Sequence, residues 1–292
     1  MRKWDLENGR TLSRFKGHHD HILAIVLDGN YAYTGSLDRS VRKWNIKTGK
    51  MEMVFRGHKR GVHALQVGGR YVYSGSYDRT VRKWDTKTGK IDQIFHGHSH
   101  MITDIQMANK NKTMYTASWD RKIRKWNVNK TKTFQTLRGH KKPVLALEPQ
   151  GDYLFSGSLD RDVRMWNAST GRTLKIFRGH TAAVTAIQVV GDYMYTGSVD
   201  TQILQWNIDK NALVGVFRLH DSAVTDLEVR GTTLFSASSR GMKSSSLLVK
   251  SMFGVNTSLD FDTYNPIVST KGGDHHAHET NLQQVCSRLF CF

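Results

Sequence analysis

The sequence predicts an all-β repeat fold built from four-stranded antiparallel units. Trp-Asp or Trp-Asn pairs occur six times, and the intervals between their tryptophans are 40, 40, 42, 40 and 40 residues. Gly-His pairs follow the same interval from Gly17-His18 to Gly179-His180, and Leu219-His220 is an altered sixth copy. A fixed period of this length indicates a repeat architecture, because each period is one supersecondary unit.

The segment 57–90 shows how one unit is built. Short runs with apolar alternation predict strands at residues 62–67, 71–76, 81–84 and 91–95. Turn residues separate them: Gly69 supplies the positive φ that a tight turn requires, Asp78 begins the next turn, and Gly89 belongs to the last. The 42-residue interval has its extra length at 108–112, where we expect a longer hairpin loop.

These features resemble the WD-repeat β-propeller family over roughly residues 1–238. The resemblance implies four-stranded blades arranged around an axis, each with a buried hydrogen-bond chain of His, Ser or Thr, Asp and Trp. By position the five sets are His18, Thr34, Asp38 and Trp44; His58, Ser74, Asp78 and Trp84; His98, Thr116, Asp120 and Trp126; His140, Ser156, Asp160 and Trp166; and His180, Thr196, Asp200 and Trp206. Buried indole, imidazole and carboxylate groups must each be paired, which favours the same interpretation.

Both ends of the repeat region are incomplete. The position of a turn aspartate for Trp4 would precede Met1, and Arg240 stands where the last aspartate is expected. Strands are predicted at 224–229 and 233–238, with no tryptophan after them. We therefore expect the N-terminal third and fourth strands to complete the C-terminal first and second strands in a composite blade. The count is then five intact blades plus one, and a truncated seven-bladed propeller is the alternative.

The predicted domains are a propeller at 1–250 and a polar, mostly disordered tail at 251–292. Ser244–Val249 is a candidate for one additional strand. The tail contains a His275–Glu279 cluster with Cys286 and Cys291, but this spacing matches no structural zinc pattern, so we expect no metal and no cofactor.

Cysteine placement and the N-terminal composition predict an intracellular protein, cytoplasmic or nuclear. Neither cysteine lies in the repeats, so disulfides do not hold the fold. No signal peptide or membrane span is expected.

The net charge is +18, and basic residues concentrate between Lys110 and Lys142, where eleven Lys or Arg accompany one acid, Asp120. Such a segment attracts nucleic acid, acidic proteins or anionic head groups. The alternative interpretation is a solvated surface, because strand alternation would scatter these side chains. The candidate residues for nucleic acid or an acidic partner are Lys110, Lys112, Lys122, Lys125, Lys130, Lys132, Lys141 and Lys142.

A second candidate surface follows from the resemblance, which implies that partners bind the rim formed by the loops before the first strand and between the second and third strands. The residues that we expect there are unusually apolar, as in interface hot spots. They are Leu23, Leu37, His63, Tyr77, Met101, Trp119, Leu145, Leu159 and Val199, with Tyr77 and Trp119 the strongest candidates. The alternative is that some of them fill the central channel.

The function predicted from these patterns is a non-catalytic protein-interaction scaffold, or the recognition module of a larger complex, with one or more protein partners. RNA or ribonucleoprotein binding through 110–142 is the alternative. We expect no enzyme and no small-molecule substrate. Five copies of a His, Ser and Asp set indicate scaffolding, since an enzyme needs one site, and the common catalytic and nucleotide-binding motifs are absent from the sequence.

Overall fold

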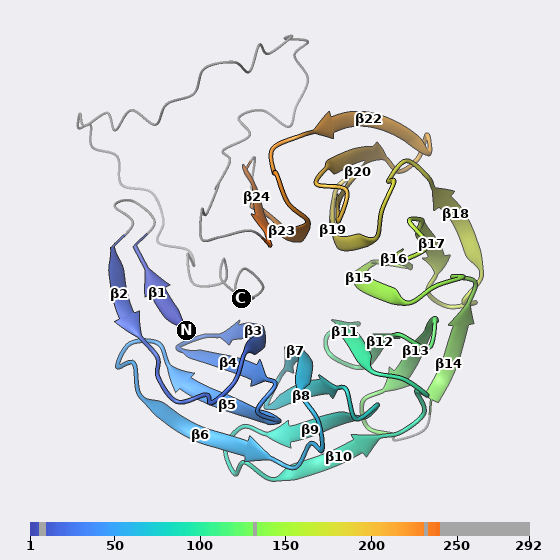
Figure 1. The fold of residues 1–292 in the computed structure, drawn as a ribbon. Coiled ribbons are helices and arrows are strands. Elements are labelled where there is room, and N and C mark those ends of the chain that lie inside the picture. The colour runs from blue at the N-terminus through green and yellow to red at the C-terminus, as the bar shows by residue number, and fades with distance from the viewer. Residues whose placement is uncertain (6–9, 131–132, 231–232, 240–292) are drawn as a thin grey trace, which may run out of the picture.

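The computed structural model describes residues 1–5, 10–130, 133–230 and 233–239 (Figure 1). The tail at 251–292, the candidate strand at 244–249 and the candidate metal cluster lie outside these residues. All regular elements in the described part of the chain are β-strands, and it contains no helix that could cross a membrane.

Five antiparallel sheets have four strands each, paired in chain order. The first blade contains β3 (Ile22–Asp28), β4 (Tyr31–Ser36), β5 (Ser40–Asn45) and β6 (Met51–Arg56). The second contains β7 (Val62–Gly68), β8 (Tyr71–Ser76), β9 (Val81–Asp85) and β10 (Ile91–Phe95). The third contains β11 (Ile102–Ala108), β12 (Thr113–Ser118), β13 (Lys122–Asn127) and β14 (Thr133–Arg138).

The fourth blade contains β15 (Val144–Gln150), β16 (Tyr153–Ser158), β17 (Val163–Asn167) and β18 (Thr173–Phe177). The fifth contains β19 (Val184–Val190), β20 (Tyr193–Ser198), β21 (Ile203–Asn207) and β22 (Ala212–Phe217). The strands predicted at 62–67, 71–76, 81–84 and 91–95 are confirmed, with β7 and β9 each one residue longer. The all-β, four-stranded repeat is confirmed as well.

The blades are arranged around an axis, with each first strand on the inside and each fourth strand on the outside (Figure 1). Neighbouring first strands contact one another from β3 through to β23 (Val224–Arg230). The loop expected at 108–112 is also present, because Asn109, Lys110 and Asn111 all have positive φ, at 52°, 52° and 64°. This run of left-handed residues accommodates the longer interval without disturbing the β11–β12 pairing.

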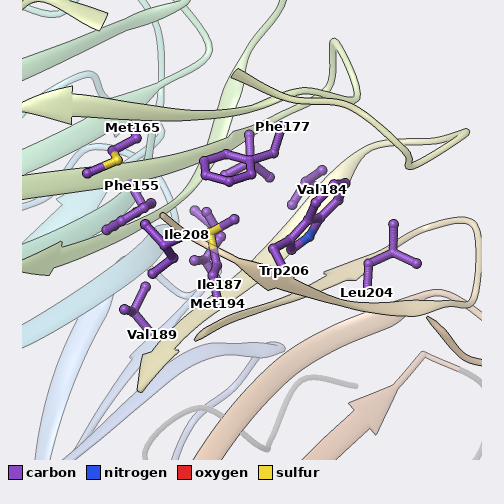
Figure 2. Packing of buried hydrophobic residues seen from close by; sticks show 12 residues of the cluster. Phe155, Met165, Phe177, Val184, Ile187, Val189, Met194, Leu204, Trp206 and Ile208 are labelled. Atoms are coloured by element: carbon purple, nitrogen blue, oxygen red, sulfur yellow. The ribbon is translucent and has the colours of Figure 1, made fainter. Parts of the chain in front are cut away.

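Apolar cores lie between adjacent blades. The tryptophan of each four-stranded blade is buried, and in four blades its ring meets a phenylalanine near the end of the preceding outer strand. These edge-on pairs are Phe15–Trp44, Phe55–Trp84, Phe95–Trp126 and Phe177–Trp206, with centroids 5.6–5.9 Å apart. Figure 2 shows the core in which Phe177 of the fourth blade meets Trp206 of the fifth. Such pairs contribute about 0.5–1.5 kcal/mol beyond the burial of their area.

The hydrogen-bond chain expected in each blade is present in all five. In the second blade the Trp84 indole donates to Ser74 Oγ at 2.7 Å, Ser74 Oγ pairs with His58 Nε2 at 2.7 Å, and His58 Nδ1 lies 2.8 Å from Asp78 Oδ2. The other four blades have the same contacts. A neutral imidazole that donates from Nδ1 and accepts at Nε2 satisfies every member of this chain.

The glycine of each Gly-His pair leaves room for this arrangement. A Cβ placed on Gly57 would lie 2.5 Å from an Arg82 guanidinium nitrogen and 3.3 Å from the Trp84 ring. At Gly17 the corresponding distance to Arg42 is also 2.5 Å. The Gly-His pairs and the tryptophans therefore recur together, because the glycine leaves the room that the tryptophan and arginine side chains occupy.

The predicted composite blade is wrong, since the ring is open in the structure. β1 (Arg2–Trp4) and β2 (Thr11–Arg14) form one two-stranded sheet, β23 and β24 (Thr233–Ser238) form another, and no strand pairing joins the two in the described residues (Figure 1). His220 Nε2 does pair with Ser236 Oγ at 2.7 Å, but Trp4 is only partly buried and lies beside Arg2. A three-residue β1 offers few hydrogen bonds to β24, and no turn connects the two hairpins directly.

Replacement of Ser156 by alanine tests the hydrogen-bond chain. Ser156 is fully buried and bridges the Trp166 indole and the His140 imidazole. Ser156→Ala leaves both groups unpaired, so we expect a loss of about 2–4 kcal/mol in the free energy of unfolding, measured by urea denaturation. The control is Ser169→Ala, since Ser169 bonds Asn167 at the exposed surface and its loss should cost no more than about 0.5 kcal/mol. Equal costs for the two variants would contradict this role.

Acid is expected to destabilise the fold in two stages. Burial lowers the pKa of His18, His98 and His180, so the unfolded chain binds more protons than the folded one, and stability falls as the pH falls below about 6.5. Burial alone would raise the pKa of Asp120, but its hydrogen bonds from His98 and main-chain N–H groups outweigh burial and lower that pKa to about 2.

The turn aspartate Asp38 has a lowered pKa for the same reason, so a second loss of stability is expected as the pH falls below about 4. Thermal unfolding between neutral and strongly acidic pH measures both stages. His19→Gln, at an exposed site, is the control and should leave the profile unchanged. A midpoint that stays constant or rises on acidification would refute the account.

Candidate functional site

The candidate binding surface is one end of the propeller, here called the turn rim: the loops before the first strands together with the turns between the second and third strands. Main-chain hydrogen bonds of 2.9–3.1 Å join the two segments in every complete blade. The donors are the N–H groups of Leu37, Tyr77, Trp119, Leu159 and Val199, and the acceptors are the carbonyls of His21, Gly61, Met101, Pro143 and Ala183. The expectation that these segments share a rim is therefore confirmed.

Apolar side chains are exposed at this rim. Trp119 is 43% exposed, Leu159 36% and Val199 46%, whereas Leu37 and Tyr77 are partly buried. These five side chains occupy the same turn position in successive blades, and they are called the rim anchors below. The Trp119 ring stacks on His100 at 5.6 Å between centroids, and the Tyr77 ring lies 5.6 Å from that of His63.

Three residues predicted for the rim loops lie within inner strands instead. Leu23 is in β3, His63 in β7 and Leu145 in β15. His63 Nδ1 contacts the Thr103 carbonyl of the next blade at 3.2 Å, and burial lowers the pKa of His63. The strand predicted at 62–67 already contained His63, and its imidazole makes a contact between blades within that strand.

The basic segment 110–142 does not form one surface. Lys110, Lys112 and Lys130 lie in the hairpin loops at the end opposite the turn rim. Lys122 begins β13 beside Arg138, and Lys141 and Lys142 belong to the loop before β15, so these three are at the turn rim. A six-residue strand, about 20 Å long, separates the two groups. Lys132 lies outside the described residues.

Lys125, in the middle of that segment, contributes to the packing of the blade. Its ammonium donates to the Ala168 carbonyl of the next blade at 2.6 Å and lies 5.4 Å from the Phe134 ring. Burial lowers the pKa of Lys125. This lysine therefore joins neighbouring blades and is not presented to a polyanion.

Two further sets of cations recur with the period of the repeat. Arg39, Arg79, Arg121 and Arg161 directly follow the turn aspartates, and all four are exposed, while Thr201 stands at this position in the fifth blade. The residue before each Gly-His pair is also basic and exposed, at Lys16, Arg56, His96, Arg138 and Arg178. The signal for both sets in the sequence is their period, and the structure places both at the turn rim.

Two hollows mark the opposite ends of the disc. At the turn rim of the second blade, Lys59, Arg60, Arg79 and His96 line a hollow of about 420 Å³ together with Tyr77. The other, of about 620 Å³, lies between the fourth and fifth blades at the opposite rim, where Asp152, Asp192 and Asp209 are among its lining residues. The linings of the two hollows thus differ in charge.

Comparisons with known proteins support the architecture. The crystal structure of the computationally designed Ika8 protein is similar, with a TM-score of 0.72 and 28% identity, covering 81% of this chain and 74% of that chain. No curated protein matches the sequence.

A family model matches residues 2–241, and its description is "Outer membrane protein assembly factor BamB", a PQQ-type repeat family. The WD-repeat assignment made from the Trp-Asp and Gly-His pairs is therefore wrong. Those pairs reflect packing within a four-stranded blade, where tryptophan fills the interblade core and glycine leaves room for it, and they do not identify one family. The match spans most of the chain, which belongs to the family described as outer membrane protein assembly factor BamB.

Proposed function

We propose that this protein is a non-catalytic binding module whose turn rim docks one or more protein partners. The observation that carries the proposal is the exposure of Trp119, Leu159 and Val199 at equivalent turns of three successive blades. Exposed apolar side chains held by a rigid scaffold are typical of interface hot spots.

The geometry of the turns supports this role. Each rim anchor precedes a turn aspartate that is fixed by the buried histidine, as Asp120 is by His98 at 2.8 Å. Its main-chain N–H is also held, as in the bond from Trp119 to Met101. The anchors are therefore pre-organised, which lowers the entropic cost of binding.

The family description supports a protein partner in a general way. The family is described as an assembly factor, and assembly is consistent with contacts to other proteins. RNA binding through 110–142 is not favoured, because the lysines of that segment are divided between the two rims and Lys125 is committed to blade packing. A cytoplasmic or nuclear location stays a prediction from the sequence.

Replacement of Trp119 by alanine tests the proposed rim. We expect Trp119→Ala to weaken the affinity for the captured partner by at least about 30-fold, since an aromatic anchor that becomes buried in the complex contributes about 2 kcal/mol or more to binding. The measurement is affinity capture from nuclease-treated lysate, followed by titration of the recovered partner.

Phe134→Ala is the matched control. Phe134 is 72% exposed but lies on β14, an outer strand away from the rim. This variant should bind the partner as wild type does. If Trp119→Ala retains the partner, or if Phe134→Ala loses it equally, the turn rim is not the docking surface.

A further inference from the structure

We propose that the partner segment bound at the turn rim is an acidic peptide, and that cations around the rim anchors receive its carboxylates. The proposal rests on the proposed function and names the chemistry of the partner at that same surface.

Cations outnumber acids at the turn rim. In the first four blades its exposed cations are Arg39, Arg56, Lys59, Arg60, Arg79, Arg121, Arg138, Lys141, Lys142, Arg161 and Arg178. The acids among the described residues of these rim segments are the four turn aspartates, each bonded to a buried histidine, together with Asp20, which contacts His21, and Asp162, which lies 3.5 Å from Arg178. A neutral histidine leaves the charge of its aspartate in place, so eleven cations face six carboxylates and the surface has a net positive charge.

The opposite rim also carries cations. Arg70 forms an ion pair with Asp85 there, and the exposed Lys47, Lys87 and Lys90 lie in its hairpin loops. What distinguishes the turn rim is that its cations surround the exposed rim anchors. An acidic partner that also has apolar side chains would find both kinds of contact at the turn rim.

The turn that follows each rim anchor presents one further side chain. Arg39, Arg79, Arg121 and Arg161 have φ of 69°, 72°, 68° and 76°, the left-handed region that favours glycine or asparagine. Thr201 has the same conformation in the fifth blade, with φ of 72°, so the turn and not the arginine sets this φ. In the first four blades the turn therefore holds an exposed guanidinium two residues after a rim anchor.

The hollow of the second blade offers a specific place for carboxylates. Lys59 and Arg60 come from the loop before β7, Arg79 from the following turn and His96 from the end of β10. The one acid in the lining, Asp78, is directed to His58 Nδ1 at 2.8 Å, the Lys59 N–H at 3.0 Å and the Thr80 hydroxyl at 2.6 Å. The cations that line the hollow therefore remain for a ligand.

The rim anchors favour a peptide over a nucleic acid. Single-stranded nucleic acid binds by stacking its bases on aromatic faces. Three of the five anchors, Leu37, Leu159 and Val199, are aliphatic, and Trp119 already has one face covered by His100. Aliphatic anchors alternating with cations instead match a chain in which apolar and acidic side chains alternate.

The test is fluorescence anisotropy with a labelled peptide in which glutamates alternate with leucine and phenylalanine, at about 0.15 M salt. The rim variant is Lys59→Glu/Arg60→Glu/Arg79→Glu. Its control, Lys47→Glu/Lys87→Glu/Lys90→Glu, changes the net charge equally at exposed sites of the opposite rim. We expect the rim variant to bind at least about tenfold more weakly and the control to change by less than about threefold.

A second variant distinguishes loss of charge from misfolding of the first variant. Arg39→Asn/Arg79→Asn/Arg121→Asn/Arg161→Asn removes four charges with a residue suited to positive φ, so it should fold and still bind the peptide at least about tenfold more weakly. Equal weakening in the opposite-rim control, or tighter binding of wild type to oligo(U) than to the peptide, would overturn the acidic-peptide assignment.

The two proposals fail in different ways. If Trp119→Ala loses the captured partner while the rim variant keeps both partner and peptide, the rim binds protein but not through acidic groups. If the rim variant alone loses the peptide and Trp119→Ala retains the captured partner, the acidic-peptide site stands and the docking role of the rim anchors fails.

Discussion

The hydrogen-bond chain from tryptophan through a hydroxyl and histidine to the turn aspartate is the interaction on which the structure depends. In the third blade it links Trp126, Thr116, His98 and Asp120, and so connects two strands, the turn between them and the loop that enters the blade. The tryptophan also packs on Phe95 of the preceding blade. One buried unit therefore fixes both the strands within a blade and the contact between blades, and its loss would leave several buried polar groups unpaired.

The same chain determines the shape of the turn rim. Asp120 accepts the main-chain N–H of Ser99 at 3.1 Å and that of Lys122 at 3.0 Å, so the entering loop and the turn are held together by one carboxylate. Trp119 and Arg121 stand on either side of it, one exposed and apolar, the other exposed and cationic. A structural requirement of the fold thus presents an apolar and a positive group side by side in the first four blades, and Val199 with Thr201 in the fifth shows that these two positions can vary without disturbing the core.

Periodicity explains which features could be predicted from the sequence. The strands and the buried sets from His18 to Trp206 recur in five repeats, so each copy supports the interpretation of the others. Ring closure involves pairing between the two ends of the repeat region, where no second copy exists, and that prediction was wrong.

The candidate sites were harder to predict. The segment 110–142 looks continuous along the chain, but antiparallel strands carry Lys112 and Lys142 to opposite rims. His63 was expected at the rim although the predicted strand at 62–67 contains it, because a contact with the next blade, such as that of His63 with the Thr103 carbonyl, leaves no local pattern in the sequence. The tryptophan motif predicted the blade and not the family, since the packing of the blade itself requires those residues.

Amide hydrogen exchange of the complex with its captured partner tests the central claim most directly, because it reports which end of the propeller is covered. The account predicts slower exchange in the turns at 36–40, 76–80, 118–122 and 158–162 and in the loops before the first strands, with no change in the turns at 46–50 and 86–90. Protection confined to that opposite rim, or to the outer strands β6, β10, β14 and β18, would contradict it.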